Sequence, residues 1–139
     1  MNRPIAILSL VLLGSALQGC VIYDDDHHHH FHDDPVFADL RVYWEFRGGL
    51  DCFEADVGAI LIEVEGFGRV DEFGFVDCHL GFVDIPGDFP TARAFRPGTY
   101  HVTVFGFPPR DAPANWVAEG RVELFPGSND YTFRLSPFF

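Results

Sequence analysis

Residues 39–47 read Asp-Leu-Arg-Val-Tyr-Trp-Glu-Phe-Arg, and this stretch predicts the fold class of the chain. Apolar and polar side chains alternate along it. One face would carry Leu40, Val42, Trp44 and Phe46, and the other Arg41, Tyr43, Glu45 and Arg47. Because successive side chains of a β-strand point to opposite faces, this period of two indicates a half-buried strand.

Similar alternation recurs along the rest of the chain, with glycine and proline at the breaks. We expect further strands over residues 57–65, 70–78, 80–85, 98–107, 116–125 and 131–135. Gly66-Phe67-Gly68 and the run from Pro126 to Asp130 are rich in turn-forming residues. No convincing amphipathic helix accompanies the strands. The pattern predicts an all-β domain over residues 38–139, an antiparallel sandwich of about seven strands.

The segment Arg96-Pro97-Gly98-Thr99-Tyr100, followed by Val102 and Val104, carries a family resemblance. Pro-Gly-Thr-Tyr with alternating valine resembles the carboxypeptidase regulatory-like, or prealbumin-like, sandwich domains, and several immunoglobulin-like families share this pattern. The resemblance implies an immunoglobulin-like or prealbumin-like sandwich. Known members mostly act as structural, spacer or binding modules, so the resemblance also implies that the domain is not an enzyme.

The first 19 residues have the features of a secretory signal peptide. Arg3 is followed by an apolar run over residues 5–13 and then by the small residues at 14–16. The run is shorter than the ~20 residues that a membrane-spanning helix needs. It ends in Leu17-Gln18-Gly19-Cys20, which resembles the lipobox of bacterial lipoproteins. Gln18 departs mildly from that pattern, because the position usually holds a smaller residue.

The lipobox resemblance implies both a lipid anchor and a cellular location. It implies cleavage before Cys20, a diacylglycerol on the Cys20 sulfur and acylation of the new amino terminus. It also implies a lipid-anchored protein of the cell envelope. Val21 stands where aspartate often marks retention in the inner membrane, so the resemblance favours the bacterial outer membrane. The alternative is an ordinary signal peptide with an unrelated cysteine.

Residues 20–37 form a low-complexity segment between the anchor and the domain. It contains Asp24-Asp25-Asp26, His27-His28-His29-His30, His32 and Asp33-Asp34. Such a polar segment buries too little apolar surface to fold alone, so we expect a flexible tether. As a random coil it would span roughly 20–25 Å.

The same tract suggests metal binding as an alternative role. Five imidazoles, from His27, His28, His29, His30 and His32, could bind Zn²⁺, Ni²⁺ or Cu²⁺, and the aspartates offer further oxygen ligands. Contiguous ligands without fixed geometry provide little selectivity, so a solvated spacer is the preferred interpretation.

Two further cysteines, Cys52 and Cys78, lie in the predicted domain. In an oxidising compartment such a pair most naturally forms a disulfide. Two buried thiols remain an alternative, as does a two-cysteine metal site assisted by His79. No cysteine spacing typical of a zinc site supports the latter.

Charge and composition exclude several functions. The chain has 9 basic and 21 acidic residues, a net charge of −12 and no lysine. Nucleic acid and anionic lipid would repel such a chain, and lysine-based catalysis is ruled out. After the signal peptide the serines are Ser128 and Ser136, neither in the setting of a nucleophile. We therefore expect no enzyme.

Phenylalanine is unusually frequent, with 16 residues. Most should fill the core. Six lie in or near predicted loops and irregular strands, and some of these could form an exposed patch for an envelope protein, a glycan or a membrane: Phe67, Phe73, Phe75, Phe82, Phe89 and Phe107.

Overall fold

The computed structural model of the chain describes residues 36–138, which form an all-β domain. Its strands are β1 (Ala38–Phe46), β2 (Ala59–Gly66), β3 (Arg69–Asp77), β4 (Phe82–Ile85), β5 (Gly98–Phe107), β6 (Trp116–Leu124) and β7 (Gly127–Pro137). The all-β class and the seven predicted strands are therefore confirmed for this part of the chain.

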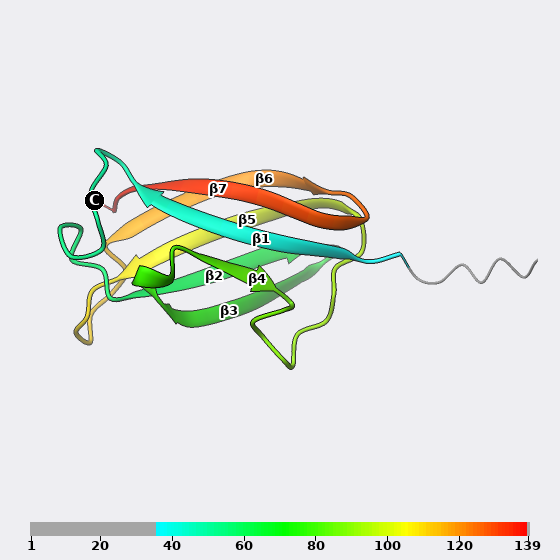
Figure 1. Cartoon of the computed structure of the whole chain (residues 1–139), viewed down its shortest axis with the longest axis horizontal. Helices are drawn as coiled ribbons and strands as arrows, with labels where there is room; N and C mark the ends of the chain where they lie inside the picture. Colours follow the sequence, from blue (N-terminus) through cyan, green and yellow to red (C-terminus); the bar gives the residue numbers. More distant parts are fainter. Residues whose placement is uncertain (1–35, 139) are drawn as a thin grey trace, which may run out of the picture. The chain divides into compact units, whose positions relative to one another are not determined.

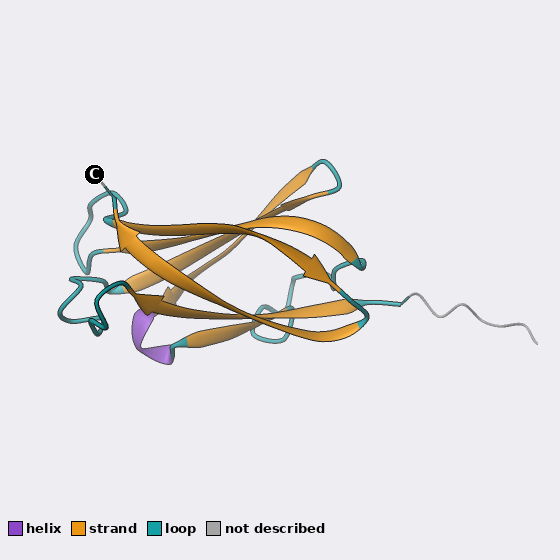
Figure 2. Ribbon diagram, turned by 90° about the horizontal axis from the view of Figure 1, so that it is seen from above, coloured by secondary structure: helices purple, strands orange, loops and turns teal. Residues whose placement is uncertain are grey.

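The strands form one mixed sheet in the order β3-β2-β5-β6-β7-β1-β4, curled into a half-barrel (Figures 1 and 2). The β6–β7 pairing is the narrowest link in the sheet. It consists of the pairs Trp116↔Pro137 and Val117↔Ser136. The sheet bends there, so that β4, β1 and β7 lie on one side of the link and β3, β2, β5 and β6 on the other.

The expectation of a wholly antiparallel arrangement is wrong at one place. β1 and β7 run parallel, in register from Ala38↔Gly127 to Phe46↔Leu135. Alternation along a strand shows which side chains face the core but not the direction of the neighbouring strand. A short hairpin would force an antiparallel pair, and no such hairpin joins the first and last strands.

The core lies between the inward faces of the curled sheet. In β1 the four residues predicted to face inward, Leu40, Val42, Trp44 and Phe46, are all buried. They pack with the alternating apolar residues of the other strands, such as Ile60 and Ile62 of β2, Val102 and Val104 of β5, and Leu135 of β7. The predicted inward and outward faces are thus correct.

The last strand begins earlier than predicted. Residues 127–130, expected to form a turn, are the first part of β7. The side chain of Asn129 makes the turn instead. Its Oδ1 accepts from the N–H of Phe125 at 2.9 Å, and its Nδ2 donates to the carbonyls of Phe125 and Gly127. Because one amide side chain satisfies these backbone groups, the strand can start within a polar run.

The third strand ends one residue earlier than predicted and the fourth begins two residues later, because a 3-10 turn over Cys78–Leu80 separates them. Asp77 caps this turn: its Oδ1 accepts from the N–H of His79 at 2.8 Å. That hydrogen bond holds the pKa of the Asp77 carboxyl below its ordinary value. Gly81 then takes a left-handed backbone, with φ of 76°, and β4 begins at Phe82.

The strands give the domain two ends. The start of β1, the β2–β3 turn, the start of β5 and the β6–β7 turn share what we call the leading end, where the chain enters the domain (Figure 1). The far end holds the loop between β1 and β2 and the last residues of β7.

Candidate binding surfaces

The predicted functional residues fall into two groups. Cys20 and the histidines His27, His28, His29, His30 and His32 lie outside the described residues. Cys52 and Cys78 are described, and they form the predicted disulfide, with 6.0 Å between their Cα atoms. This bond leaves no thiolate for a two-cysteine metal site. His79 is exposed, and its Nδ1 lies 3.2 Å from Oδ1 of Asp77.

Two buried tryptophans hold the backbone around the disulfide. Nε1 of Trp44 donates to the carbonyl of Cys78 at 2.9 Å, and Nε1 of Trp116 donates to the carbonyl of Ala55 at 2.8 Å. Indole hydrogen bonds therefore fasten the loop that carries Cys52 to β6 and the turn that carries Cys78 to β1, in addition to the sulfur bridge. These contacts indicate a structural cross-link.

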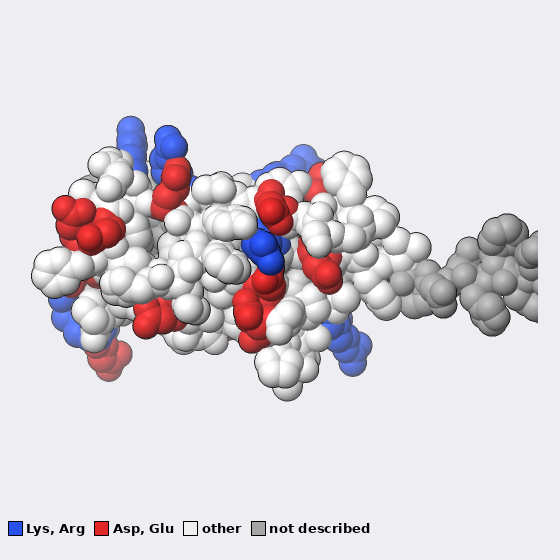
Figure 3. Space-filling view, in the orientation of Figure 1, with Lys and Arg blue, Asp and Glu red and all other residues white. Residues whose placement is uncertain are grey.

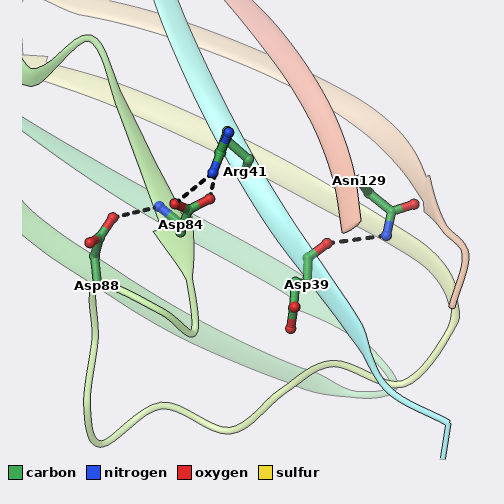
Figure 4. Close-up of polar contacts among 5 residues, drawn as sticks. All are labelled: Asp39, Arg41, Asp84, Asp88 and Asn129. Atoms are coloured by element: carbon green, nitrogen blue, oxygen red, sulfur yellow. Dashed lines mark hydrogen bonds and ion pairs between the residues drawn. The ribbon is translucent and has the colours of Figure 1, made fainter. Parts of the chain in front are cut away.

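A polar network joins β1, β4 and β7 (Figure 4). Arg41 donates two hydrogen bonds to the Asp84 carboxylate, at 2.6 and 3.0 Å, and this pairing raises the pKa of Arg41. Asp88 accepts from the N–H of Asp84 at 2.7 Å, and Nδ2 of Asn129 donates to the carbonyl of Asp39 at 3.1 Å. The network ties neighbouring strands together, which is a structural role.

The other titratable side chains of the domain are dispersed. His101 is exposed on β5, as predicted, and its Nε2 lies 3.6 Å from Oε2 of Glu119. Among residues 36–138, histidine, cysteine, aspartate and glutamate form no group of three that could hold a metal ion. Over the same residues, no helix is long and apolar enough to cross a membrane.

Half of the six phenylalanines singled out from the sequence are exposed. Phe67, Phe75 and Phe82 are exposed, Phe73 is buried, and Phe89 and Phe107 are half-buried. The sequence missed Phe53, which is 88% exposed, and Phe125. Phe125 directly precedes Pro126, and that position was the available signal, whereas the neighbours of Phe53, Cys52 and Glu54, gave none.

Three phenylalanines form a row on the outer face of the sheet. The Phe75 and Phe107 rings pack edge to face with centroids 5.0 Å apart, and the Phe105 ring lies 6.5 Å from that of Phe107. Phe75 reaches this face because of a β-bulge. Ile60 pairs with Val76 and Leu61 with Gly74, which leaves Phe75 as the extra residue. We call these residues the outer aromatic row.

A groove of about 900 Å³ opens at the leading end and combines aromatic and basic side chains. Phe67 and Tyr100 line it with Arg69, Arg93 and Arg96. The Arg96 guanidinium lies 5.2 Å from the centre of the Phe67 ring. The Tyr100 hydroxyl donates to the Arg96 carbonyl at 2.8 Å, and burial raises the pKa of Tyr100.

Comparison of the chain with protein-family models, curated proteins and solved structures found no match.

Proposed function

We propose that the chain is a lipid-anchored protein of the cell envelope whose β domain is a non-catalytic binding module. The ordered signal features ending at Cys20 support the anchor. The Cys52–Cys78 disulfide is compatible with a compartment outside the cytoplasm. By the lipobox resemblance and Val21, the anchor lies in the outer membrane of a bacterium.

We further propose that the domain is related to the immunoglobulin-like or prealbumin-like sandwiches. The Pro97-Gly98-Thr99-Tyr100 signature supports this relation, and Tyr100 is one of the core residues. The narrow β6–β7 link supports it too, because it divides the strands into groups of three and four that share one core. By the same resemblance the domain is a structural or binding module.

The outer aromatic row carries the proposal of a binding role. Phe75 is 64% exposed although it packs on Phe107, so the row presents apolar area to solvent on the outer face of the sheet, beside the edge strand β3. Contiguous apolar area of this kind marks binding sites, and aromatic side chains contribute much of the energy of such contacts. The partner is an envelope protein or a glycan.

The first prediction concerns the anchor. In cells, Cys20→Ser should move the protein from the membrane fraction to the soluble fraction or leave it as uncleaved precursor, since the sulfur that receives the lipid is gone. Immunoblotting of fractionated cells measures this change. Mass analysis of the wild-type amino terminus serves as the control. An unmodified Cys20 together with unchanged membrane partitioning would disprove the anchor.

The second prediction concerns the partner. Phe75→Ser should reduce capture of a partner from envelope extracts roughly tenfold, as expected for the loss of a central aromatic anchor. Quantitative mass spectrometry compares this variant with the wild-type chain and with Phe138→Ser, which removes another exposed phenylalanine. Equal capture by the Phe75 variant would rule out the outer aromatic row as the binding surface.

Divalent-metal binding or buffering through the His tract is the second candidate function. It is favoured by the five histidines among five aspartates between residues 24 and 34. Binding to neutral imidazole should weaken below pH ~6.5, as the rings take up protons. A variant with serine at His27, His28, His29, His30 and His32, added to the same capture experiment, separates the candidates. If the variant captures as much partner as the wild-type chain, partner binding is a property of the β domain and not of the His tract.

A further inference from the structure

Apolar side chains gather at the leading end of the domain. Five large apolar residues at this end are at least 50% exposed: Val36, Phe37, Phe67, Val70 and Phe125. Phe37 and Phe67 line the same groove. The N–H of Gly127 donates to the Phe37 carbonyl at 3.0 Å, which brings the β6–β7 turn and its Phe125 to the same end. We call these five residues the apolar cap.

The charged side chains are distributed differently. On the face shown in Figure 3, most aspartate, glutamate and arginine side chains lie over the middle and the far end, and the outermost part of the leading end shows few of them. Beside the cap, the groove is lined by Arg69, Arg93 and Arg96 and by one carboxylate, Asp71, which pairs with Arg69 at 3.1 Å. The groove therefore has a local surplus of positive charge in a strongly acidic chain.

Phe67 is placed outward against its local conformational preference. It lies in the tight β2–β3 turn with φ of 51°, a left-handed backbone that glycine and asparagine adopt far more readily than phenylalanine. The residue as a whole is 58% exposed, so burial offsets this unfavourable conformation only in part. Phe67 also packs on Tyr100 and beneath Arg96, and the exposed remainder of its side chain at the tip of the turn is available for a contact outside the chain.

We propose that the leading end rests on a phospholipid bilayer, with the apolar cap in the interfacial region and the groove arginines on lipid phosphates. The inference rests on the proposed anchor at Cys20. The 15 residues from Val21 to Pro35 reach at most about 50 Å at ~3.4 Å per residue. They join the domain at the leading end, so this end has the shortest path to the membrane.

A bilayer accounts for the whole set of residues. Phenylalanine suits the boundary between headgroups and acyl chains, and arginine can extend to phosphates while its stem stays on apolar surface. Charges are screened within about 8 Å at physiological ionic strength, so the charges of the far end act little on lipid phosphates beside the groove. A second copy of the chain fits less well, because a symmetric pair would bring the groove arginines of two copies together.

The test uses chemical anchoring, so that it does not depend on lipidation in the cell. With Cys52 and Cys78 joined, Cys20 is the only free thiol of the chain from residue 20 to 139. It can therefore be coupled to a maleimide lipid in vesicles of phosphatidylethanolamine and phosphatidylglycerol in equal amounts. Quenching by brominated lipid is then compared between Phe67→Trp at the cap and Phe53→Trp in the β1–β2 loop. The wild-type chain supplies the background from the buried Trp44 and Trp116.

We expect quenching at least about twofold stronger for Phe67→Trp, because brominated chains quench only groups near the bilayer. Quenching of the Phe67→Trp variant should decrease when Phe37→Ser and Phe125→Ser are added to it. It should not decrease when the control pair, Leu50→Ser and Phe138→Ser, is added instead, because these exposed residues lie outside the cap. Equal quenching of the two tryptophan variants would overturn the proposal. Weak quenching together with a dimer in analytical ultracentrifugation would assign the cap to a second copy.

Failure of this test and failure of the anchor proposal are distinct results. Fractionation of cells with Cys20→Ser asks whether the cell attaches a lipid. The quenching experiment asks which end of an already anchored domain meets the bilayer, and it gives an answer whichever way the first experiment ends.

Discussion

Replacing Cys52 and Cys78 together with alanine should lower the free energy of unfolding of the domain by about 3.5 kcal/mol, the chain-entropy value for a loop of this length. The disulfide joins residues 26 positions apart, so its removal frees a long loop in the unfolded chain. For a domain of this size that is a large fraction of the total stability. Urea denaturation followed by tryptophan fluorescence measures the change.

Two controls isolate the effect of the cross-link. The wild-type chain with its disulfide reduced should unfold at nearly the same urea concentration as the double variant, since both have lost the same constraint. Adding reductant to the double variant should change nothing. If the unfolding midpoint of the double variant stays at that of the oxidised wild type, the disulfide stabilises the domain far less than its loop length predicts.

Gly66→Ala should lower the free energy of unfolding by roughly 2–3 kcal/mol, in the range found for overpacked cores. A Cβ atom at Gly66 would overlap the ring of Tyr100 at Cδ1 and Cε1. That ring has little room to move. It lies between Phe67 and Phe95, with centroids 5.5 and 5.3 Å away, and its hydroxyl is bonded to the Arg96 carbonyl. Thermal and urea unfolding give the change.

Gly120→Ala is the matched control, because Gly120 also lies in a strand and its nearest contact would be an ordinary one, 3.4 Å from Cε1 of Phe133. We expect little loss of stability there, since alanine is no worse than glycine in an extended strand. Comparable losses at both positions would mean that the Tyr100 ring yields easily. The overlap at Gly66 would then not determine stability.

The inward and outward faces of the strands could be predicted because the alternation of apolar and polar residues follows the alternation of buried and exposed positions. In β1 the inward positions are those that the apolar pattern predicts, and they are all buried. The disulfide could be predicted in the same local way, from two cysteines in one predicted domain. The parallel β1–β7 pair could not, because strand direction depends on the path of the chain between them.

The turns show a second limit of sequence-based prediction. The run from Pro126 to Asp130 has the composition of a turn, yet β7 begins within it because one side chain, Asn129, supplies the turn's hydrogen bonds. Composition identifies residues able to turn but does not show which of them do so. The predicted strand boundary at Cys78 was wrong for a similar reason. Asp77 caps a 3-10 turn at a point where the alternating pattern of the sequence continues.

The candidate surfaces were predicted less well than the fold. Exposure of a phenylalanine depends on the register of its strand, and Gly74, a residue type that often marks a bulge inside a strand, is the one local sign of the bulge that turns Phe75 outward. The groove arginines lie at positions 69, 93 and 96, on segments that meet only in the folded chain. Their local surplus of positive charge is concealed in the sequence by an overall charge of −12.

The parallel pairing of the first and last strands determines how the domain would bear a mechanical load. β1 starts at the leading end and β7 finishes at the far end, so a pull between the two termini acts along both strands in opposite directions (Figure 1). The hydrogen bonds from Ala38↔Gly127 to Phe46↔Leu135 then share the force in shear and must give way together. A protein held to a membrane at one end and pulled by a partner at the other would therefore resist extension along the whole β1–β7 pair.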